Sequence, residues 1–286
     1  MDAAVRGTLY VVATPIGNLE DATRRAVRVL GEVDWIACED TRHTRKLLAH
    51  FGIRRPKVIS CFAGNEARRA ESLAARLGRG ETGALVTDAG TPGISDPGAR
   101  VVRAALDAGA RVIPVPGPSA LTAALSASGF PADRFRFLGF LPPRAGARAE
   151  ALAEAVASMD PVVIFESPRR AADTLAALAA RAPDRACAVF REITKVYEDA
   201  RRGTLAEVAG ALSSVASRGE FVIVLGPAAR IAAGEAEVAA EMAERIGRGQ
   251  STSDAAREVA RRLRVPRAQA YRAGLGLRGR HGERDG

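Results

Sequence analysis

The stretch "ALVTDAGTPGISDPG" (84–98) joins a short apolar run to a loop that is rich in glycine and proline. The loop itself, 87–98, holds three glycines, two prolines and two aspartates in twelve residues. An amphipathic run, "ARVVRAALDAG", follows it. A bare connection between a strand and a helix needs only a few residues. We therefore interpret this loop as one that is shaped to hold a ligand.

The sequence on both sides of the loop alternates apolar strands with amphipathic helices. The pattern predicts strands at 8–14, 34–39, 57–60, 84–87 and 111–115, and helices at 22–31, 41–50, 66–78 and 98–108. This spacing is typical of a mostly parallel sheet with helices on its faces. Such sheets bind ligands beyond the carboxyl ends of their strands. The loops that follow the strands are therefore expected at one edge of the sheet.

A second α/β set follows, and the tail has a different composition. Strands are predicted at 134–140, 161–166, 185–192 and 220–226, which gives an α/β fold with two α/β domains, 1–117 and 118–228. The remainder, 229–286, is rich in alanine and arginine and is predicted to be a small helical appendage. Its two expected short helices are "STSDAAREVARRL", with Ser251 and Asp254 in capping-box spacing, and "VPRAQAYRAGL", opened by Pro266.

Charge and composition narrow the class of protein. The chain of 286 residues carries a net charge of +9, and 39 of its 42 basic residues are arginines. Eleven arginines and four acids lie between Arg245 and Gly286, which favours a polyanionic partner. No apolar run reaches the length of a membrane span, and the N-terminus does not resemble a signal peptide. Three scattered cysteines are expected to be buried thiols of a cytoplasmic protein.

Several common site types are missing from the sequence. The turn after the first strand, "ATPIGNLEDAT", has the single glycine Gly17 and not G-x-G-x-x-G. There is no Walker motif, no H-E-x-x-H and no G-x-S-x-G, and His43 and His50 are expected on a solvated helix face. We expect no metal site.

Two Pro/Gly loops remain as candidates for ligand binding. The carboxylate of Asp88, at a strand end, can accept hydrogen bonds from a ligand hydroxyl or amine. In "PGPSAL", Pro118 is placed at the first helical position, which leaves the amides of Ser119 and Ala120 free. Either loop could be a structural turn, but two of them at one sheet edge favour a ligand site.

An ordered series of motifs resembles a known family. The series is "LYVVATPIGNLEDAT", "CEDTRHTRKLL", "ALVTDAGTPGISDPG", "PVPGPSALTAAL", "FLGFLP", "FESPRR", "REITKVYED" and "GEFVIVLG". It is similar to the bacterial 16S rRNA cytidine 2′-O-methyltransferases, a branch of the tetrapyrrole-methylase superfamily of S-adenosylmethionine (SAM) enzymes. The resemblance covers about residues 7–226.

The resemblance implies a cofactor, a partner and a set of binding residues. SAM would fold up in a cleft between the two α/β domains, and 16S rRNA in the small ribosomal subunit would be the substrate of a homodimer. Pro15 would lie in the loop that faces the acceptor. The other implied cofactor residues are Asp88, Ala89, Gly90, Ser119, Ala120, Leu141 and Ser167.

The sequence departs from tetrapyrrole methylases in one turn. Those enzymes usually have G-x-G-P-G-D after the first strand, whereas this chain has "ATPIGN". The departure favours an RNA substrate. A small-molecule methylase that acts on a tetrapyrrole, and an RNA-binding module without enzymatic activity, are the competing hypotheses.

Methyl transfer to a ribose hydroxyl needs alignment and removal of a proton. The candidate general bases are Asp40, Glu192, Lys195 and Glu198, and Lys195 is notable because the chain otherwise uses arginine. Lys195 could equally contact a phosphate or have a structural role. The candidate RNA-binding residues are Arg42 and Arg45 on the predicted helix 41–50 and Arg261, Arg262 and Arg267 in the tail.

Overall fold

The computed structural model describes residues 7–212, 219–228, 235–263 and 265–282, with side chains described as far as residue 276. The chain forms two compact units, Met1–Ala228 and Ala229–Gly286, which are considered separately below.

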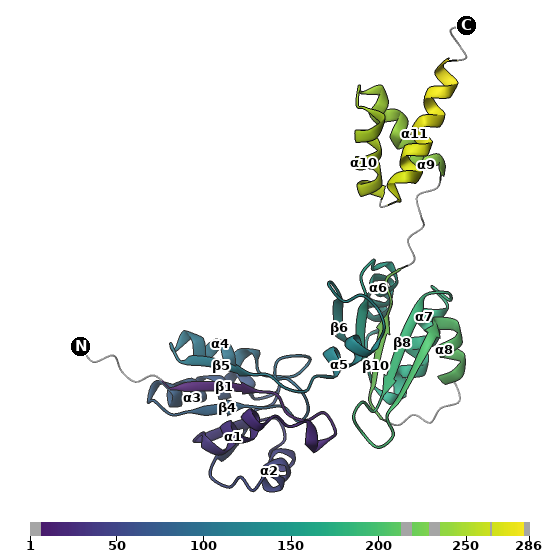
Figure 1. Ribbon diagram of the computed structural model, residues 1–286. Helices are drawn as coiled ribbons and strands as arrows, with labels where there is room; N and C mark the ends of the chain where they lie inside the picture. The colour runs from purple at the N-terminus through teal and green to yellow at the C-terminus, as the bar shows by residue number, and fades with distance from the viewer. Residues whose placement is uncertain (1–6, 213–218, 229–234, 264, 283–286) are drawn as a thin grey trace, which may run out of the picture. The chain divides into compact units, whose positions relative to one another are not determined.

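The first unit contains a parallel sheet of five strands in the order β3-β2-β4-β1-β5. Every neighbouring pair is parallel, which confirms the arrangement expected from the spacing of strands and helices. Figure 1 labels three of the strands, β1, β4 and β5, and the four helices that flank the sheet. The elements are β1 (Thr8–Val12), α1 (Arg24–Glu32), β2 (Trp35–Cys38), α2 (Thr41–His50), β3 (Lys57–Ser60), α3 (Glu66–Gly78), β4 (Gly83–Leu85), α4 (Ala99–Asp107) and β5 (Arg111–Val115).

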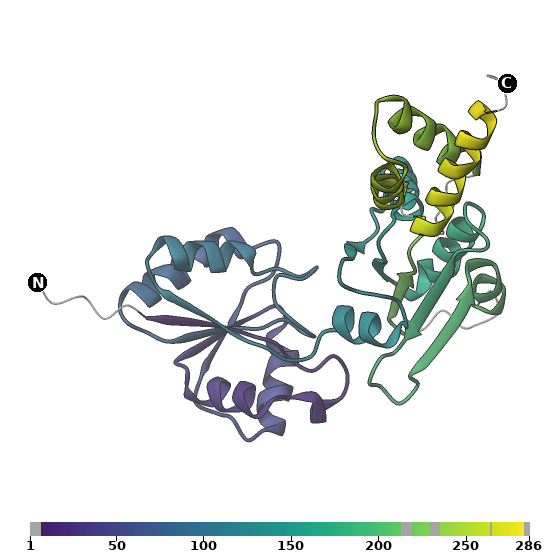
Figure 2. The same cartoon turned by 45° about the horizontal axis from the view of Figure 1, so that its top comes forward.

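Helices cover both faces of this sheet. Leu9 and Leu85 pack with buried residues of α3 and α4, while Val12 and Ala84 pack with those of α1 and α2. The same division is visible in Figures 1 and 2. All four residues of β2 are buried, as is usual for a parallel strand that is covered on both sides. Because the strands are parallel, their carboxyl ends meet at one edge.

A second sheet of five strands has the order β6-β7-β10-β8-β9. Only β6 and β7 are parallel; the other neighbours are antiparallel. The sequence did not predict β9, because "DARRGT" is polar and pairs only along one edge. The elements are α5 (Ala120–Ala127), β6 (Arg136–Phe140), α6 (Ala145–Ala157), β7 (Val162–Glu166), α7 (Pro168–Ala179), β8 (Ala186–Arg191), β9 (Asp199–Thr204), α8 (Leu205–Leu212) and β10 (Phe221–Leu225).

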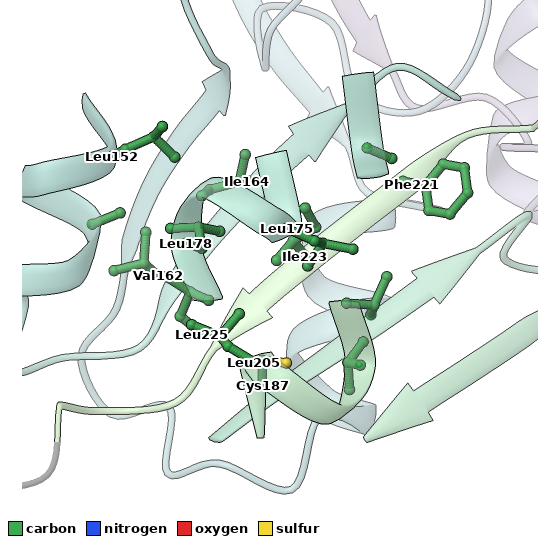
Figure 3. Close-up of a cluster of buried hydrophobic side chains, with 14 of the residues drawn as sticks. Leu152, Val162, Ile164, Leu175, Leu178, Cys187, Leu205, Phe221, Ile223 and Leu225 are labelled. Carbon is green, nitrogen blue, oxygen red and sulfur yellow. The ribbon is translucent and has the colours of Figure 1, made fainter. Parts of the chain in front are cut away.

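The core of the second sheet is apolar on both faces. Figure 3 shows Leu152, Leu175, Leu178 and Leu205 of the helices gathered against strand side chains such as Ile223. Buried residues of α5 cover the opposite face. The strands of the two sheets lie on either side of residues 117–118, but the described contacts unite them in one compact unit. A division into separate domains at that point remains a prediction.

The second unit is a small bundle of three helices, α9 (Glu235–Gly247), α10 (Thr252–Leu263) and α11 (Arg267–Gly282). The sequence predicted only the last two, so α9 is a correction. Val238 and Met242 of α9 complete a core with Ala255, Ala256 and Val259 of α10. The amide of Asp254 donates to the Ser251 hydroxyl over 3.1 Å, as the capping-box spacing predicted.

The cysteines and two of the histidines lie as the sequence predicted. Cys38, Cys61 and Cys187 are buried free thiols, and burial raises the pKa of Cys61 and of Cys187 to about 11. His43 and His50 are exposed on α2. Among the helices that the structure describes, none has both the length and the apolar character needed to cross a membrane.

Candidate functional site

A cavity of about 420 Å³ lies where the carboxyl-end loops of the first sheet meet residues of the second sheet. We call it the first cavity. The loops after β1, β4 and β5 supply one side of it, and β6, β7 and β10 supply the other. Its lining is Ile16, 88–91, 94–96, Ser119, Ala120, Phe140, 165–168 and 220–222.

The loop after β4 is fixed to the loop after β1. The amide of Thr14 donates to the Gly90 carbonyl over 2.9 Å, and the amide of Gly90 donates back to the Thr14 carbonyl over 3.1 Å. Gly90 has a φ of 83°, a conformation that side chains other than glycine rarely adopt. The buried Thr14 hydroxyl also donates to the Thr87 carbonyl. These contacts hold the loop that lines the first cavity in one shape.

The far end of the same loop is fixed by a buried carboxylate. Oε1 of Glu66 accepts from the amides of Gly98 and Arg100, both over 2.9 Å. These amides belong to the first turn of α4, which has no side-chain cap of its own. The carboxylate therefore satisfies donors that the helix start would otherwise leave unpaired.

One end of the first cavity is acidic. Oδ1 of Asp88 accepts from the amide of Asp40 over 3.0 Å, which connects the carboxyl ends of β4 and β2. Burial and the charges of Glu39 and Asp88 raise the pKa of Asp96 to about 6. Burial, followed by the charges of Asp88 and Asp40, also raises the pKa of Glu39. A cation bound here would relieve this repulsion. Among the described residues, no group of three or more acids, histidines or cysteines is arranged to hold a metal ion.

The opposite side of the first cavity is rich in aromatic side chains, and Glu166, Ser167 and Glu220 also line it. The rings of Phe140 and Phe165 lie edge to face, with their centroids 5.7 Å apart, and Phe140 is 56% exposed. Phe221 and Val222 of β10 extend this side. The cavity thus combines an aromatic wall with polar loops, a composition typical of sites for small organic ligands.

The start of α5 differs in detail from the prediction. The helix begins at Ala120 with Ser119 as its N-cap, so Pro118 precedes the helix and is not its first residue. The Ser119 side chain makes no capping bond. The first amides of α5 therefore remain available beside the first cavity.

Six of the eight residues proposed to bind a cofactor line the first cavity: Asp88, Ala89, Gly90, Ser119, Ala120 and Ser167. Pro15 precedes the lining residue Ile16. Leu141 is only 2% exposed and belongs to the core of the second sheet, and its carbonyl accepts from Arg170 over 2.9 Å.

Sequence reasoning missed the aromatic wall and Asp96. The signal for Asp96 was present, because it lies in the same loop as Asp88. The phenylalanines gave none, since an aromatic residue in a strand usually belongs to the core.

Lys195 is held as a cation. Its Nζ lies 2.9 Å from Oε1 of Glu192 and 2.9 Å from Oε2 of Glu220. Partial burial acts to lower the pKa of Lys195, but the hydrogen bonds and charges of the two glutamates outweigh it and raise the pKa. A lysine in this state is unsuited to remove a proton, so the arrangement favours the alternative role as a structural or phosphate-binding cation.

Two of the carboxylates proposed as bases, Asp40 and Glu192, already accept hydrogen bonds within the protein. Asp40 is the N-cap of α2, and hydrogen bonds from the Arg42 side chain and amide hold its pKa well below the usual range. Burial acts to raise the pKa of Glu192, but the bond from Lys195 and that from the Glu220 amide lower it overall. Of the proposed bases, Glu198 does not line the first cavity but does line a second one beside it.

That second cavity has a volume of about 450 Å³ and shares Ile16 and Ser119 with the first. It lies between loops of both sheets. Its lining is Ile16, Asp21, Thr23, 117–119, Ala123, Ile193, Thr194 and Glu198.

The arginines proposed to bind RNA differ in the contacts that they make within the protein. Arg42 forms an ion pair with Asp40 over 2.8 Å, and Arg45 donates to the Thr41 hydroxyl over 3.3 Å. In the helical unit, Arg262 pairs with Glu241 over 2.8 Å and Arg267 donates to the Ser253 hydroxyl over 2.9 Å.

The helical unit is less basic than its last 42 residues. Residues 229–286 contain twelve arginines and eight acids, which is a net charge of +4. The additional acids belong to α9, where Glu241 pairs with Arg245 and Arg262, and Glu244 pairs with Arg248. The strongly basic stretch from Arg245 onward is therefore partly neutralised by the helix that packs against it.

Comparison with known proteins gives consistent matches. The family model of the tetrapyrrole (corrin/porphyrin) methylases matches residues 8–209. The chain is 43% identical over 287 residues to "Ribosomal RNA small subunit methyltransferase I" of Mesorhizobium japonicum, an alignment that covers 97% of this chain and 95% of the relative. It is 50% identical over 226 residues to the protein of the same name from Xylella fastidiosa, covering 78% and 82% of the two chains.

Solved structures share the fold. Uroporphyrin-III-C-methyltransferase from Thermus thermophilus has a TM-score of 0.55 at 21% identity and covers 77% of this chain and 94% of its own. A structure of that enzyme complexed with S-adenyl homocysteine has a TM-score of 0.53, also at 21% identity, and covers 77% of this chain and 97% of its own. Diphthine synthase has a TM-score of 0.59 at 15% identity, covering 77% and 89%. The chain therefore belongs to the tetrapyrrole methylases and, within them, to the ribosomal RNA small subunit methyltransferase I family.

Proposed function

We propose that this protein transfers the methyl group of SAM to the ribose 2′-hydroxyl of a cytidine, number 1402, in 16S rRNA. The family membership supports the rRNA substrate, and the first cavity supports the cofactor. The assembled small ribosomal subunit as the target, a homodimeric state and a cytoplasmic location are parts of the same proposal, taken from the resemblance of the motifs.

The residues of the first cavity fit SAM in charge and in shape. SAM combines a cationic methionine part with a flat adenine ring. The acidic end, with Asp88 and the Asp96 carboxyl, suits the ammonium and sulfonium charges. The wall of Phe140 and Phe165 and the small residues Ser119 and Ala120 suit the ring. This division of the cavity is the observation on which the SAM-dependent part of the proposed function rests, while the rRNA substrate rests on the family membership.

Bound SAM would supply an activated methyl group, so the chain's own residues mainly have to align the acceptor. The Thr14–Gly90 bridge and the Glu66 contacts keep the loop with Asp88 rigid before any ligand arrives. Such preorganisation avoids an ordering cost when ligands bind.

Glu198 is the residue that we propose as the acceptor of the hydroxyl proton. Lys195 is held as a cation, and the pKa of Asp40 lies too low for a base. Oε2 of Glu198 accepts from the Thr194 amide over 2.9 Å, and the residue lines the second cavity.

Ribose methylation of small ribosomal subunits tests the proposal. Subunits from a bacterium that lacks this modification would be incubated with the protein and SAM, and methylation would be mapped by mass spectrometry of 16S rRNA fragments. We expect one added methyl group on a cytidine ribose. Methylation of another nucleotide would contradict the proposal. So would the absence of methylation when the protein is folded and binds SAM.

Two parallel assays separate the competing hypotheses. Methyl transfer to uroporphyrinogen-like compounds would favour the small-molecule methylase. Calorimetry that detects RNA binding but no SAM binding would favour an RNA-binding module without activity.

A further inference from the structure

A hairpin tip beside the second cavity carries features that the cofactor site does not use. The tip, 192–198, connects β8 to β9. Glu192 and Thr194 have φ values of 52° and 67°, which are unfavourable for residues other than glycine and especially for a β-branched threonine. Such conformations persist only where surrounding contacts enforce them.

The contacts that enforce this shape come from the tip itself and from the loop after β1. The Thr194 hydroxyl donates to the Asp21 carboxylate, and the Thr194 amide donates to Glu198 over 2.9 Å. The side chain of Lys195 lies over Gly17, where a Cβ atom would come within 2.4 Å of the lysine Cγ. The tip is therefore fastened to the loop after β1, and both segments contribute to the lining of the second cavity.

The tip also exposes its apolar side chains. Val196 is 93% exposed and Tyr197 is 77% exposed, more than any other large hydrophobic residue that the structure describes. An exposed aromatic ring on a rigid turn is a suitable platform for a nucleobase that has left its stack.

The charges of the second cavity select which part of a nucleotide could enter. Its polar side chains are two carboxylates, Asp21 and Glu198, and the hydroxyls of Thr23, Ser119 and Thr194, and none of the residues that line it is basic. Carboxylates repel a phosphate but accept hydrogen bonds from ribose hydroxyls and base amines. A nucleoside fits this lining, with its phosphates left outside.

We propose that the second cavity holds the target nucleoside of the RNA and that Tyr197 stacks on a base at its entrance. The inference rests on the proposed function and names where its acceptor binds. The cavity shares Ile16 and Ser119 with the proposed cofactor cavity, so a ribose held in it would lie beside the cofactor. It also explains why Glu198 has access to the acceptor although it does not line the first cavity.

Filling the cavity tests the first part. Ala123 on α5 lines the second cavity but not the first, and Ser126 lies one turn further along the same helix, exposed and in neither cavity. We expect Ala123→Phe to lower kcat/KM for small ribosomal subunits by about 100-fold, because a misplaced acceptor loses its alignment. The affinity for SAM, measured by calorimetry, should stay within about twofold. Ser126→Phe is the matched control and should leave both nearly unchanged.

Replacing the exposed ring tests the second part without a risk to folding. Tyr197→Ala should raise KM for subunits by about 5- to 150-fold, since stacking of one base on an aromatic ring contributes roughly this much. Tyr197→Phe, which keeps the ring, should restore the wild-type KM. The SAM affinity should be unaffected in both variants.

Two results would overturn the inference. If Ala123→Phe weakens SAM binding in step with methylation, the second cavity belongs to the cofactor. If Ala123→Phe and Tyr197→Ala both methylate subunits with wild-type kcat/KM, the acceptor binds elsewhere. A wild-type protein that fails to methylate subunits at all would instead refute the proposed function.

Discussion

The α/β unit and the helical unit have hydrophobic cores of different composition. The α/β unit buries large side chains such as Trp35, Leu9 and Ile164 between sheets and helices, and it supplies every residue that lines the first cavity. The helical unit has a core made mainly of alanine and valine, together with Met242. Arginines of this unit form ion pairs with the glutamates of α9.

This difference indicates that the two units have different functions. A rigid cavity needs long-range contacts, and the loops of the α/β unit are held by bonds between distant residues such as Thr14 and Gly90. Phosphate binding needs only charge on a stable support, which a small helical bundle provides. We infer that cofactor binding belongs to the first unit and that RNA attachment is shared with the second.

Removing the helical unit should produce the largest effect. Deletion of residues 229–286 should raise KM for small ribosomal subunits by at least about 100-fold, because phosphate contacts dominate affinity for nucleic acids. SAM affinity should be retained, since no residue of the first or the second cavity is lost. The deletion begins at residue 229 and not at Arg245, where the basic stretch starts, because a deletion from Arg245 would divide α9. Steady-state methylation and calorimetry measure the two quantities. Equal loss of SAM binding would show that the units do not act separately.

Asp88→Ala should have the next largest effect. Loss of a charged hydrogen-bond acceptor costs about 1.5–3 kcal/mol, so SAM affinity should fall by about 10- to 150-fold. Asp88→Asn is the control, because its amide oxygen can still accept from the Asp40 amide while the charge is lost. Calorimetry compares the variants, and circular dichroism checks their folding. Wild-type affinity in Asp88→Ala would place the cofactor elsewhere.

The pH dependence of SAM binding should depend on Asp96. Its carboxyl has a pKa of about 6 in the folded protein, so it is neutral at lower pH and anionic at higher pH. Only the anion attracts a cationic ligand, and affinity should therefore fall by roughly tenfold between pH 7 and pH 5. Asp96→Asn should flatten this profile and bind SAM more weakly at pH 7. An unchanged profile in the variant would show that Asp96 does not face the cation.

The smallest effect should distinguish two neighbouring arginines of α10. Both side chains are exposed, and of the two only Arg262 has an ion pair, with Glu241, among the described residues. If Arg261 contacts a phosphate, Arg261→Gln should reduce the slope of log affinity against log salt concentration by about 0.7–0.9. Arg262→Gln should change it less. Filter binding of subunits at several salt concentrations measures the slopes, and equal slopes in both variants would remove the distinction.

Much of the fold followed from local sequence patterns. Alternation of apolar runs with amphipathic helices predicted all five strands of the first sheet and its four helices. The second sheet was predicted except for β9, whose polar residues carry no strand pattern. In the helical unit, α9 was missed, because its alanines and glutamates gave no signal that separated it from the tail around it.

The candidate site was predictable only in part, for a physical reason. Its loops can be recognised from local sequence, since glycine and proline at fixed positions restrict the backbone, and this pattern was enough to select Asp88, Ser119 and Ala120. Gly90 was added by the family resemblance. Sequence alone could not reveal that Glu220, 25 residues away, holds Lys195 as a cation, or that Asp21 and Thr194 meet across 173 positions. It also could not place Phe140 and Phe165 on a cavity wall. The pKa of a side chain and the shape of a cavity depend on which distant groups folding brings within a few ångströms, and only the tertiary structure decides that.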